Sequence, residues 1–224
     1  MPGTLTRRTT DEKISAEDVG LARRYVGGPN GEIDWLFKNL DEGATAWIAD
    51  TIWQAGVHIM GSRTYQDMAA YWPTSTELLA APMNEIPKVV FSEKGSLRQG
   101  EDLTTTALRD AIRARGAEGS AASPKPSPSA ASWANAIVAS GDLVEEVTRL
   151  KQQAKKDIVA HGGARFAQSL VRFGLIDEYQ LLVHPIALGA GLPLFSRLDK
   201  PIDLKLVSTS LFSRGVVAHI YRPG

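Results

Sequence analysis

Two short stretches place glycine and cationic residues where an apolar run gives way to a helical pattern. The first is VHIMGSRTY, residues 57–65, and the second is IVAHGGARF, residues 158–166. At the carboxyl end of a parallel strand, a helix that begins at once presents unpaired N–H groups and a partial positive charge. Ligands bind at this edge of open α/β sheets. Two such helix starts side by side would suit a pyrophosphate.

The residues around these junctions support an anion site without proving one. Arg63 and Thr64 add a cation and a hydroxyl to the first junction, and Gly162-Gly163 removes Cβ atoms from the second. At either junction alone, glycines that only make the turn explain the pattern equally well. Neither stretch is a G-x-G-x-x-G motif or a phosphate loop with G-K-[ST].

Composition narrows the classes of function. The chain of 224 residues has 25 Lys plus Arg and 25 Asp plus Glu, so no net charge attracts nucleic acid or an anionic membrane. It has no cysteine, which excludes disulfides and thiolate metal sites and is compatible with a cytoplasmic location. No apolar run is long enough to span a bilayer, and no signal peptide is evident.

The four histidines predict no metal site, because no pair of them has the spacing of metal ligands. His161, just before the paired glycines, is the histidine closest to the expected site. A packed strand residue is the simpler interpretation of it.

Strands and helices alternate along most of the chain. Short apolar runs predict strands at 57–61, 87–92, 135–140, 157–163 and 178–188, and helical spacing predicts helices between them. Gly56 is expected to stop the helix before the first of these strands, and Asp142 to cap the helix at 142–153. Residues 203–212 and 215–221 read as a hairpin around Ser213-Arg214-Gly215. This order predicts an α/β sandwich with a mainly parallel sheet and a C-terminal antiparallel hairpin.

A single domain, residues 1–224, is expected, with an insertion at 96–132. Apart from one lysine, residues 119–132 contain only Gly, Ser, Ala and Pro, a composition that predicts a mobile loop. Residues 103–116 read as a short helix within the insertion, and Leu21–Val26 as a weak strand.

VHIMGSRTYQDM, PKVVFS and DIVAHGGARFAQSL together resemble the dihydrofolate reductase fold. The run from Gly162 to Phe195, GGARFAQSLVRFGLIDEYQLLVHPIALGAGLPLF, is similar to the reductase domain of the bacterial bifunctional riboflavin-biosynthesis deaminase-reductase. GPNGEIDWL is typical of its stand-alone relatives. The resemblance covers roughly residues 25–95 and 133–222, and implies a dihydrofolate reductase-like three-layer sandwich. The missing cysteines mean that the family's zinc deaminase half is absent.

The resemblance implies NADPH as cofactor and names the residues that would hold it. The segment Gly61, Ser62, Arg63, Thr64 would bind the pyrophosphate and the 2′-phosphate. The segment Ser92, Glu93, Lys94 would flank the adenosine, and Gly162, Gly163, Ala164, Arg165, Phe166 would lie against the nicotinamide and phosphates. Arg63 and Lys94 favour a 2′-phosphate, whereas Glu93 could bind the ribose hydroxyl of NADH instead.

The resemblance also implies a substrate side. Asp34 stands where dihydrofolate reductases place the carboxylate that binds substrate, although it could equally well cap or solvate a helix start. Trp35 and Tyr65 could line the same pocket or simply be core residues. The implied reaction is hydride transfer to a small pterin- or ribosylaminopyrimidine-like substrate by an NADPH-dependent oxidoreductase of riboflavin biosynthesis.

Relatives usually open with an apolar strand that ends in Ser-Leu-Asp-Gly, where this chain has Leu21-Ala22-Arg23-Arg24. That departure keeps a second hypothesis open, a non-catalytic nucleotide-binding protein that retains the fold. A purely structural module around the Ala/Ser/Pro loop is a third. As in relatives, the late hairpin and the GAGLPLF loop would supply the apolar surface of a homodimer.

Overall fold

The computed structural model describes residues 25–93, 95, 130–161 and 163–224, except for the side chain of Asp34. Its strands are β1 (Tyr25–Gly27), β2 (Ala55–Gly61), β3 (Lys88–Phe91), β4 (Ile137–Ala139), β5 (Asp157–Ala160), β6 (Tyr179–Val183), β7 (Leu192–Pro193), β8 (Leu204–Leu211) and β9 (Val217–Pro223). Its helices are α2 (Asp34–Asn39), α3 (Glu42–Trp53), α4 (Ser62–Tyr71), η1 (Trp72–Thr74), α5 (Ala80–Glu85), α7 (Ala131–Ala134), α8 (Leu143–Gln153) and α9 (Ala164–Arg172). None of these helices combines the length and the hydropathy needed to cross a bilayer.

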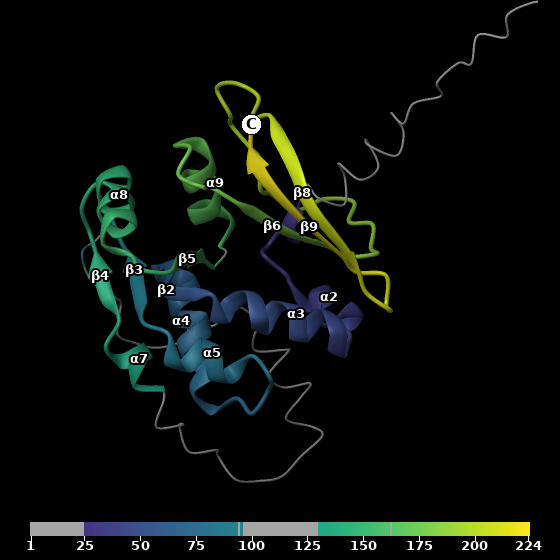
Figure 1. Ribbon diagram of the computed structural model, residues 1–224, viewed down its shortest axis with the longest axis horizontal. Coiled ribbons are helices and arrows are strands. Elements are labelled where there is room, and N and C mark those ends of the chain that lie inside the picture. Colours follow the sequence, from purple (N-terminus) through teal and green to yellow (C-terminus); the bar gives the residue numbers. More distant parts are fainter. Residues whose placement is uncertain (1–24, 94, 96–129, 162) are drawn as a thin grey trace, which may run out of the picture.

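A parallel sheet with the strand order β4-β3-β2-β5 forms one half of the fold (Figure 1). β2 pairs with β3 on one side and with β5 on the other, so that Gly61 lies opposite Phe91 and Ile59 opposite Ala160. Short Val/Ile-rich strands buried on both faces are typical of such sheets. The predicted α/β sandwich with a mainly parallel sheet is confirmed.

Alternation along the strands directs side chains to two helical layers. Met60 and Val90 face α3, α4, α5 and α7, where they form one core with Ile52, Met83 and Trp133. The opposite face packs against α8 and α9 through a second core, whose buried members are Ile59, Val89, Ala139, Val147 and Leu170. The sheet therefore lies between two layers of helices, as predicted.

α9 also joins the parallel half of the fold to the antiparallel half. Leu170 belongs to the core under the parallel sheet, whereas the next residue, Val171, packs with Tyr179 and Leu194 in a third core. The antiparallel sheet has the order β6-β9-β8, and β8 and β9 form the predicted hairpin around Gly215, whose φ is +83°. α9 therefore buries apolar side chains against both sheets.

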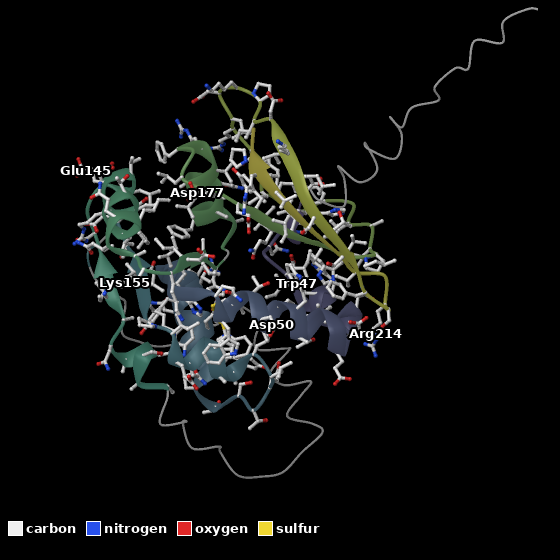
Figure 2. All side chains as sticks on the ribbon, in the orientation of Figure 1. Trp47, Asp50, Glu145, Lys155, Asp177 and Arg214 are labelled. Atoms are coloured by element: carbon white, nitrogen blue, oxygen red, sulfur yellow. The ribbon has the colours of Figure 1, made fainter. Side chains whose placement is uncertain are left out.

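The tip of the hairpin is fastened to the start of α3. Asp41 caps α3 by accepting from the Ala44 N–H at 2.8 Å, and it also accepts from Ser213 Oγ at 2.5 Å and the Arg214 N–H at 2.9 Å. These hydrogen bonds lower the Asp41 pKa to about 2, Ser213 contributing most. Trp47 on α3 and Arg214 at the hairpin tip lie close to this junction (Figure 2).

β1 pairs antiparallel with β7, where Tyr25 lies opposite Pro193 and Gly27 opposite Leu192. Of the strand expected at Leu21–Val26, only residues from Tyr25 onward lie in the described part of the chain. Among the described strands, none pairs with both β5 and β6, so the parallel and antiparallel sheets are not hydrogen-bonded to each other there. The two sheets are therefore joined by α9 and by loops.

Three expectations about element boundaries need correction or fall outside the described residues. Gly56 does not stop a helix, because α3 ends at Trp53 and Gly56 already lies in β2. The predicted mobile loop does not extend to Ser132, because α7 begins at Ala131 and its Trp133 is buried in the core. The rest of the expected insertion, residues 96–129 with the helix at 103–116, lies outside the described residues.

Replacing Gly191 with Ala should loosen the pairing of β1 with β7. A Cβ at residue 191 would lie 2.4 Å from the Gly27 carbonyl oxygen and 2.7 Å from the Tyr25 ring. We expect Gly191→Ala to lower the free energy of unfolding by about 1–3 kcal/mol in urea denaturation, as overpacking does. Gly189→Ala is the matched control, because a Cβ at residue 189 meets nothing within 4 Å. Equal effects of the two substitutions would contradict the assigned contact.

Candidate nucleotide site at the carboxyl edge of the parallel sheet

The ends of β2, β3 and β5 meet, so the structure brings together the segments that the sequence singled out. The start of α9 contacts the end of β2, because a Cβ on Gly61 would lie 3.4 Å from the Phe166 Cβ. Phe166 also packs on Phe91 at the end of β3, with ring centroids 5.2 Å apart. Residues from three distant parts of the chain therefore share one edge.

Gly163 lies closer to Thr64 than a residue with a side chain could. Gly163 has a φ of +90°, and a Cβ there would lie 2.4 Å from the Thr64 Oγ1. Any side chain at residue 163 would be strained by the backbone and would collide with Thr64. Because substitution of Gly163 would disturb the fold itself, it cannot test ligand binding.

The helices that begin at this edge differ electrostatically from α3 and α8, although the short helices α5 and α7 also lack a side-chain cap. α3 and α8 begin at Asp41 and Asp142, whose carboxylates accept from first-turn N–H groups, and both helices carry glutamate in the first turn. α4 and α9 instead begin after Gly61 and Gly163, with no side-chain cap and no acidic residue in the first turn. Uncapped helix starts of this kind are places where an anion can bind.

Each of these two helices also carries an arginine as its second residue. Arg63 and Arg165 are exposed. A cation at a helix N-terminus opposes the helix dipole, so neither arginine stabilises its own helix. Both are well placed to bind phosphate, because the guanidinium group offers several N–H donors to one anion.

The remaining residues predicted for the cofactor fall at the same edge or outside the described residues. Ser92 is 8% exposed, and its N–H donates to the Ala139 carbonyl at 3.0 Å, which extends the pairing of β3 with β4. Glu93 is the next residue along the chain. Ser62 and Ala164 are the first residues of α4 and α9. Lys94 and Gly162 lie outside the described residues.

The residues predicted for the substrate side do not all lie together: Asp34 and Trp35 are in α2, whereas Tyr65 is in the core beside the parallel sheet. The backbone of Asp34 begins α2, while its side chain is outside the described part. Trp35 donates from Nε1 to the Glu32 carbonyl at 3.1 Å and lies edge-on to His184, with ring centroids 5.3 Å apart. Tyr65 packs in the core and donates to the Trp133 carbonyl at 2.5 Å, so its core role accounts for its contacts.

A row of basic residues beside the candidate site, of which Lys88 and His58 are buried and His161 is half-buried, was not predicted from the sequence. Lys88 lies opposite His58 on neighbouring strands, and His58 contacts His161 with ring centroids 4.4 Å apart. Burial lowers the pKa of Lys88 to about 7, that of His58 to about 2 and that of His161 to about 4. Positive charge on neighbours in the row lowers the two histidine values further. Only the alternation of buried residues along β2 and β5 could have indicated that these side chains share a face.

Among the described residues, Lys88 is the one member of this row whose side chain has hydrogen-bond partners. Its Nζ donates to the Ile86 carbonyl at 2.5 Å and to Ser132 Oγ at 2.6 Å, and it lies 4.4 Å from the centre of the Trp133 ring. Both ring nitrogens of His58, and Nε2 of His161, are buried without a partner in the described part of the chain. The low pKa of His58 therefore keeps its imidazole neutral in the folded protein at pH 7.

Three layers with a mainly parallel sheet and a C-terminal antiparallel sheet define a dihydrofolate reductase-like fold. A family model described as the RibD C-terminal domain matches residues 4–218. The chain belongs to that family.

The chain is also similar to a curated relative in sequence and to solved structures in fold. The chain is 29% identical over 199 residues to YyaP, an uncharacterized protein of Bacillus subtilis, with 88% of this chain and 87% of YyaP aligned. A putative riboflavin biosynthesis protein from Shewanella sp. PV-4 has a similar fold, with a TM-score of 0.57 at 18% identity, over 90% of this chain and 93% of that one. The Thermotoga maritima diaminohydroxyphosphoribosylaminopyrimidine deaminase/5-amino-6-(5-phosphoribosylamino)uracil reductase gives a TM-score of 0.56 at 14% identity, over 89% of this chain and 53% of that one.

Acid should destabilise the protein through the buried imidazoles. The folded-state pKa of His58 lies near 2 and the unfolded value near 6.5, so below pH 6.5 the unfolded chain binds a proton that the folded chain does not. The free energy of unfolding should therefore fall by up to about 1.4 kcal/mol per pH unit between pH 6 and 4.5 for this residue alone. Urea denaturation across that range measures the slope.

His58→Leu provides the comparison, because leucine has a similar volume and His58 makes no hydrogen bond that would be lost. We expect this variant to be at least as stable as the parent protein at pH 7 and to have a shallower dependence on acid. An unchanged slope would contradict the role given to His58.

Proposed function

We propose that this protein is an NADPH-dependent reductase that acts on a small pterin- or ribosylaminopyrimidine-like substrate. The observation that carries the proposal is the pair of uncapped helix starts, each with an exposed arginine, at one edge of the sheet. Membership of the RibD C-terminal domain family supports a riboflavin-pathway pyrimidine reductase as the type of enzyme.

The residues at this edge fit a dinucleotide. The first-turn N–H groups of α4 and α9 would bind the pyrophosphate, with Arg165 supplying positive charge. Gly163 lets the chain pass close to Thr64 and leaves an exposed backbone at the start of α9. When bound, NADPH supplies a hydride, and the protein's part is to orient the two reactants and exclude water.

The 2′-phosphate distinguishes NADPH from NADH, and Arg63 is the cation proposed to bind it. Lys94 is proposed to assist, while Glu93 at the same edge would disfavour a second anion nearby. Binding of the 2′-phosphate therefore depends on whether the arginine outweighs the glutamate.

On the substrate side, Asp34 is proposed to bind the ring edge of the substrate through paired hydrogen bonds, with Trp35 beside it. A carboxylate accepts two N–H groups from a pterin or aminopyrimidine edge at once. Asp34 would fix the orientation of the ring and so decide which face receives the hydride.

Arg63→Gln should weaken binding of NADPH about 10- to 100-fold, because it removes a charge-assisted hydrogen bond to phosphate. Binding of NADH should change by less than about threefold, since NADH lacks the 2′-phosphate. Energy transfer from the five tryptophans to the reduced nicotinamide measures both affinities. Arg172→Gln, at the other end of α9, is the control and should bind both cofactors like the parent protein. Equal losses for NADPH and NADH would assign Arg63 to the pyrophosphate instead.

Measuring the rate of NADPH oxidation with each of a panel of pterins and ribosylaminopyrimidines distinguishes a reductase from a nucleotide-binding protein that has no activity. Arg23-Arg24 in place of the family's Asp-Gly is the feature that favours the second possibility. Turnover with a ribosylaminopyrimidine that is lost in Asp34→Asn would support the reductase. Tight binding of NADPH with no turnover across the panel would favour the binding protein.

We also propose that the protein is a cytoplasmic homodimer that pairs through β8. Three large apolar side chains of this strand are exposed, Leu206 at 53%, Val207 at 48% and Leu211 at 74%. Light scattering after size exclusion should give twice the 24.2 kDa of one chain. Leu211→Lys should shift the mass toward one chain, whereas Ile137→Lys, on β4 and 63% exposed, should not. A monomeric parent protein would contradict the proposal.

A further inference from the structure

α2 carries the residues proposed to bind substrate, and few contacts hold this helix in place. It has six residues and no side-chain cap at its start, so it would not persist as an isolated helix. None of its described side chains is fully buried, and none belongs to the three apolar cores. Its position therefore depends on contacts at its two ends.

At its start, α2 lies against the residue that follows β6. The ring of Trp35 meets the ring of His184 edge-on, with centroids 5.3 Å apart and an interplanar angle of 83°. His184 is only 4% exposed, so it offers a fixed surface. Trp35 Nε1 also donates to the Glu32 carbonyl at 3.1 Å, which ties the ring to the turn before the helix. The antiparallel half of the fold thus holds the start of α2.

At its other end, α2 meets the tip of the β8–β9 hairpin (Figure 1). Arg214 Nη1 donates to the Lys38 and Leu40 carbonyls, each at 3.4 Å. A cation there complements the carbonyls that the end of a helix leaves unsatisfied. Asp41 follows at once, and its Oδ2 accepts from Ser213 Oγ and the Arg214 N–H while its Oδ1 caps α3. The hairpin tip therefore holds the end of α2 and the turn into α3 together.

Both anchors of α2 belong to one corner of the antiparallel sheet. A Cβ on Gly215 would lie 3.4 Å from Pro185 Cγ, so the hairpin tip packs against the residue after His184. The tip is itself a defined turn, because the Gly215 N–H donates to the Phe212 carbonyl and the Phe212 N–H to the Val216 carbonyl, both at 2.9 Å. The end of β6 and the hairpin tip thus form one surface that contacts α2 at both ends.

We propose that Ser213 and Arg214 are positioning residues, which hold α2 against the antiparallel sheet and so fix the helix from which Asp34 and Trp35 bind substrate. This rests on the proposed function, since α2 is taken to bind the substrate. The proposed cofactor site lies instead at the starts of α4 and α9. Loss of the contacts at the tip should therefore impair the use of substrate and leave cofactor binding intact.

The double variant Ser213→Ala with Arg214→Gln removes a hydroxyl and a guanidinium from the tip and leaves Asp41 to cap α3. With 5-amino-6-(5-phosphoribosylamino)uracil as the probe substrate, we expect kcat/KM to fall about tenfold or more, because misplaced binding groups slow the reaction. The Kd of NADPH, measured by energy transfer from tryptophan, should stay within about twofold of that of the parent protein. Equal losses for substrate and cofactor would mean general damage and would overturn the proposal.

Arg222→Gln is the matched control. Arg222 lies at the other end of β9 and donates from Nε and Nη2 to Glu178 at 3.0 Å, so this variant also removes an exposed arginine that binds within the same sheet. Its kcat/KM should stay within about twofold of the parent value, since exposed ion pairs contribute little to stability. A loss as large as that of the double variant would contradict a specific role for the hairpin tip.

Fluorine NMR of protein labelled with 5-fluorotryptophan reports the position of α2 without any ligand. In the double variant the Trp35 signal, assigned with Trp35→Phe, should move toward that of free 5-fluorotryptophan as the ring leaves His184. The signals of Trp72 and Trp133, in the parallel half of the fold, should not change. An unchanged Trp35 signal would overturn the positioning role.

The same measurement keeps the proposal separate from the proposed function. Absence of turnover in the parent protein would count against the reductase, and the Trp35 signal would still decide whether the hairpin tip positions α2. If the double variant does not fold, Ser213→Ala alone removes one hydrogen bond from the tip and should move the same signal by a smaller amount.

Discussion

The burial of α9 between the two sheets is the interaction on which the rest of the structure depends. Leu170 packs into the core of the parallel sheet and Val171 into the core of the antiparallel one, so a single helix fixes their relative position. The described strands include none that joins β5 to β6 directly. Because α9 begins at the glycine turn, the packing that unites the two halves also sets the geometry of the candidate site.

Much of this arrangement could be predicted from the sequence because it depends on local patterns. The apolar runs at β2, β3 and β5, the helical spacing of α4 and α9, and the aspartate cap of α8 are properties of a few neighbouring residues. Strand alternation with helices then gives a parallel sheet, and a parallel sheet puts 61–64 and 163–166 at one edge. Both junctions were found for this reason.

What could not be predicted depends on contacts between distant residues. Gly163 looks like a residue that makes room for a ligand, whereas the structure shows that Thr64, 99 positions earlier, occupies the space of its missing Cβ. α7 reads as the end of a low-complexity loop, yet Trp133 is buried under β3 with Lys88 and Asn84 as partners. The contact of His58 with His161 likewise arises only when β2 and β5 pair.

Two local rules of stability are broken within this one site, and they are broken in complementary ways. At the surface, α4 and α9 lack the aspartate caps that α3 and α8 have, and carry arginine where the helix dipole disfavours it. Beneath them, the His58 imidazole is buried next to Lys88 with no hydrogen-bond partner among the described residues. A bound anion would stabilise the uncapped helix starts and their arginines. The buried imidazole is stable there only while it is not protonated. A folded chain departs from such rules most readily where binding compensates the loss, so their coincidence at one edge supports the proposed nucleotide site there.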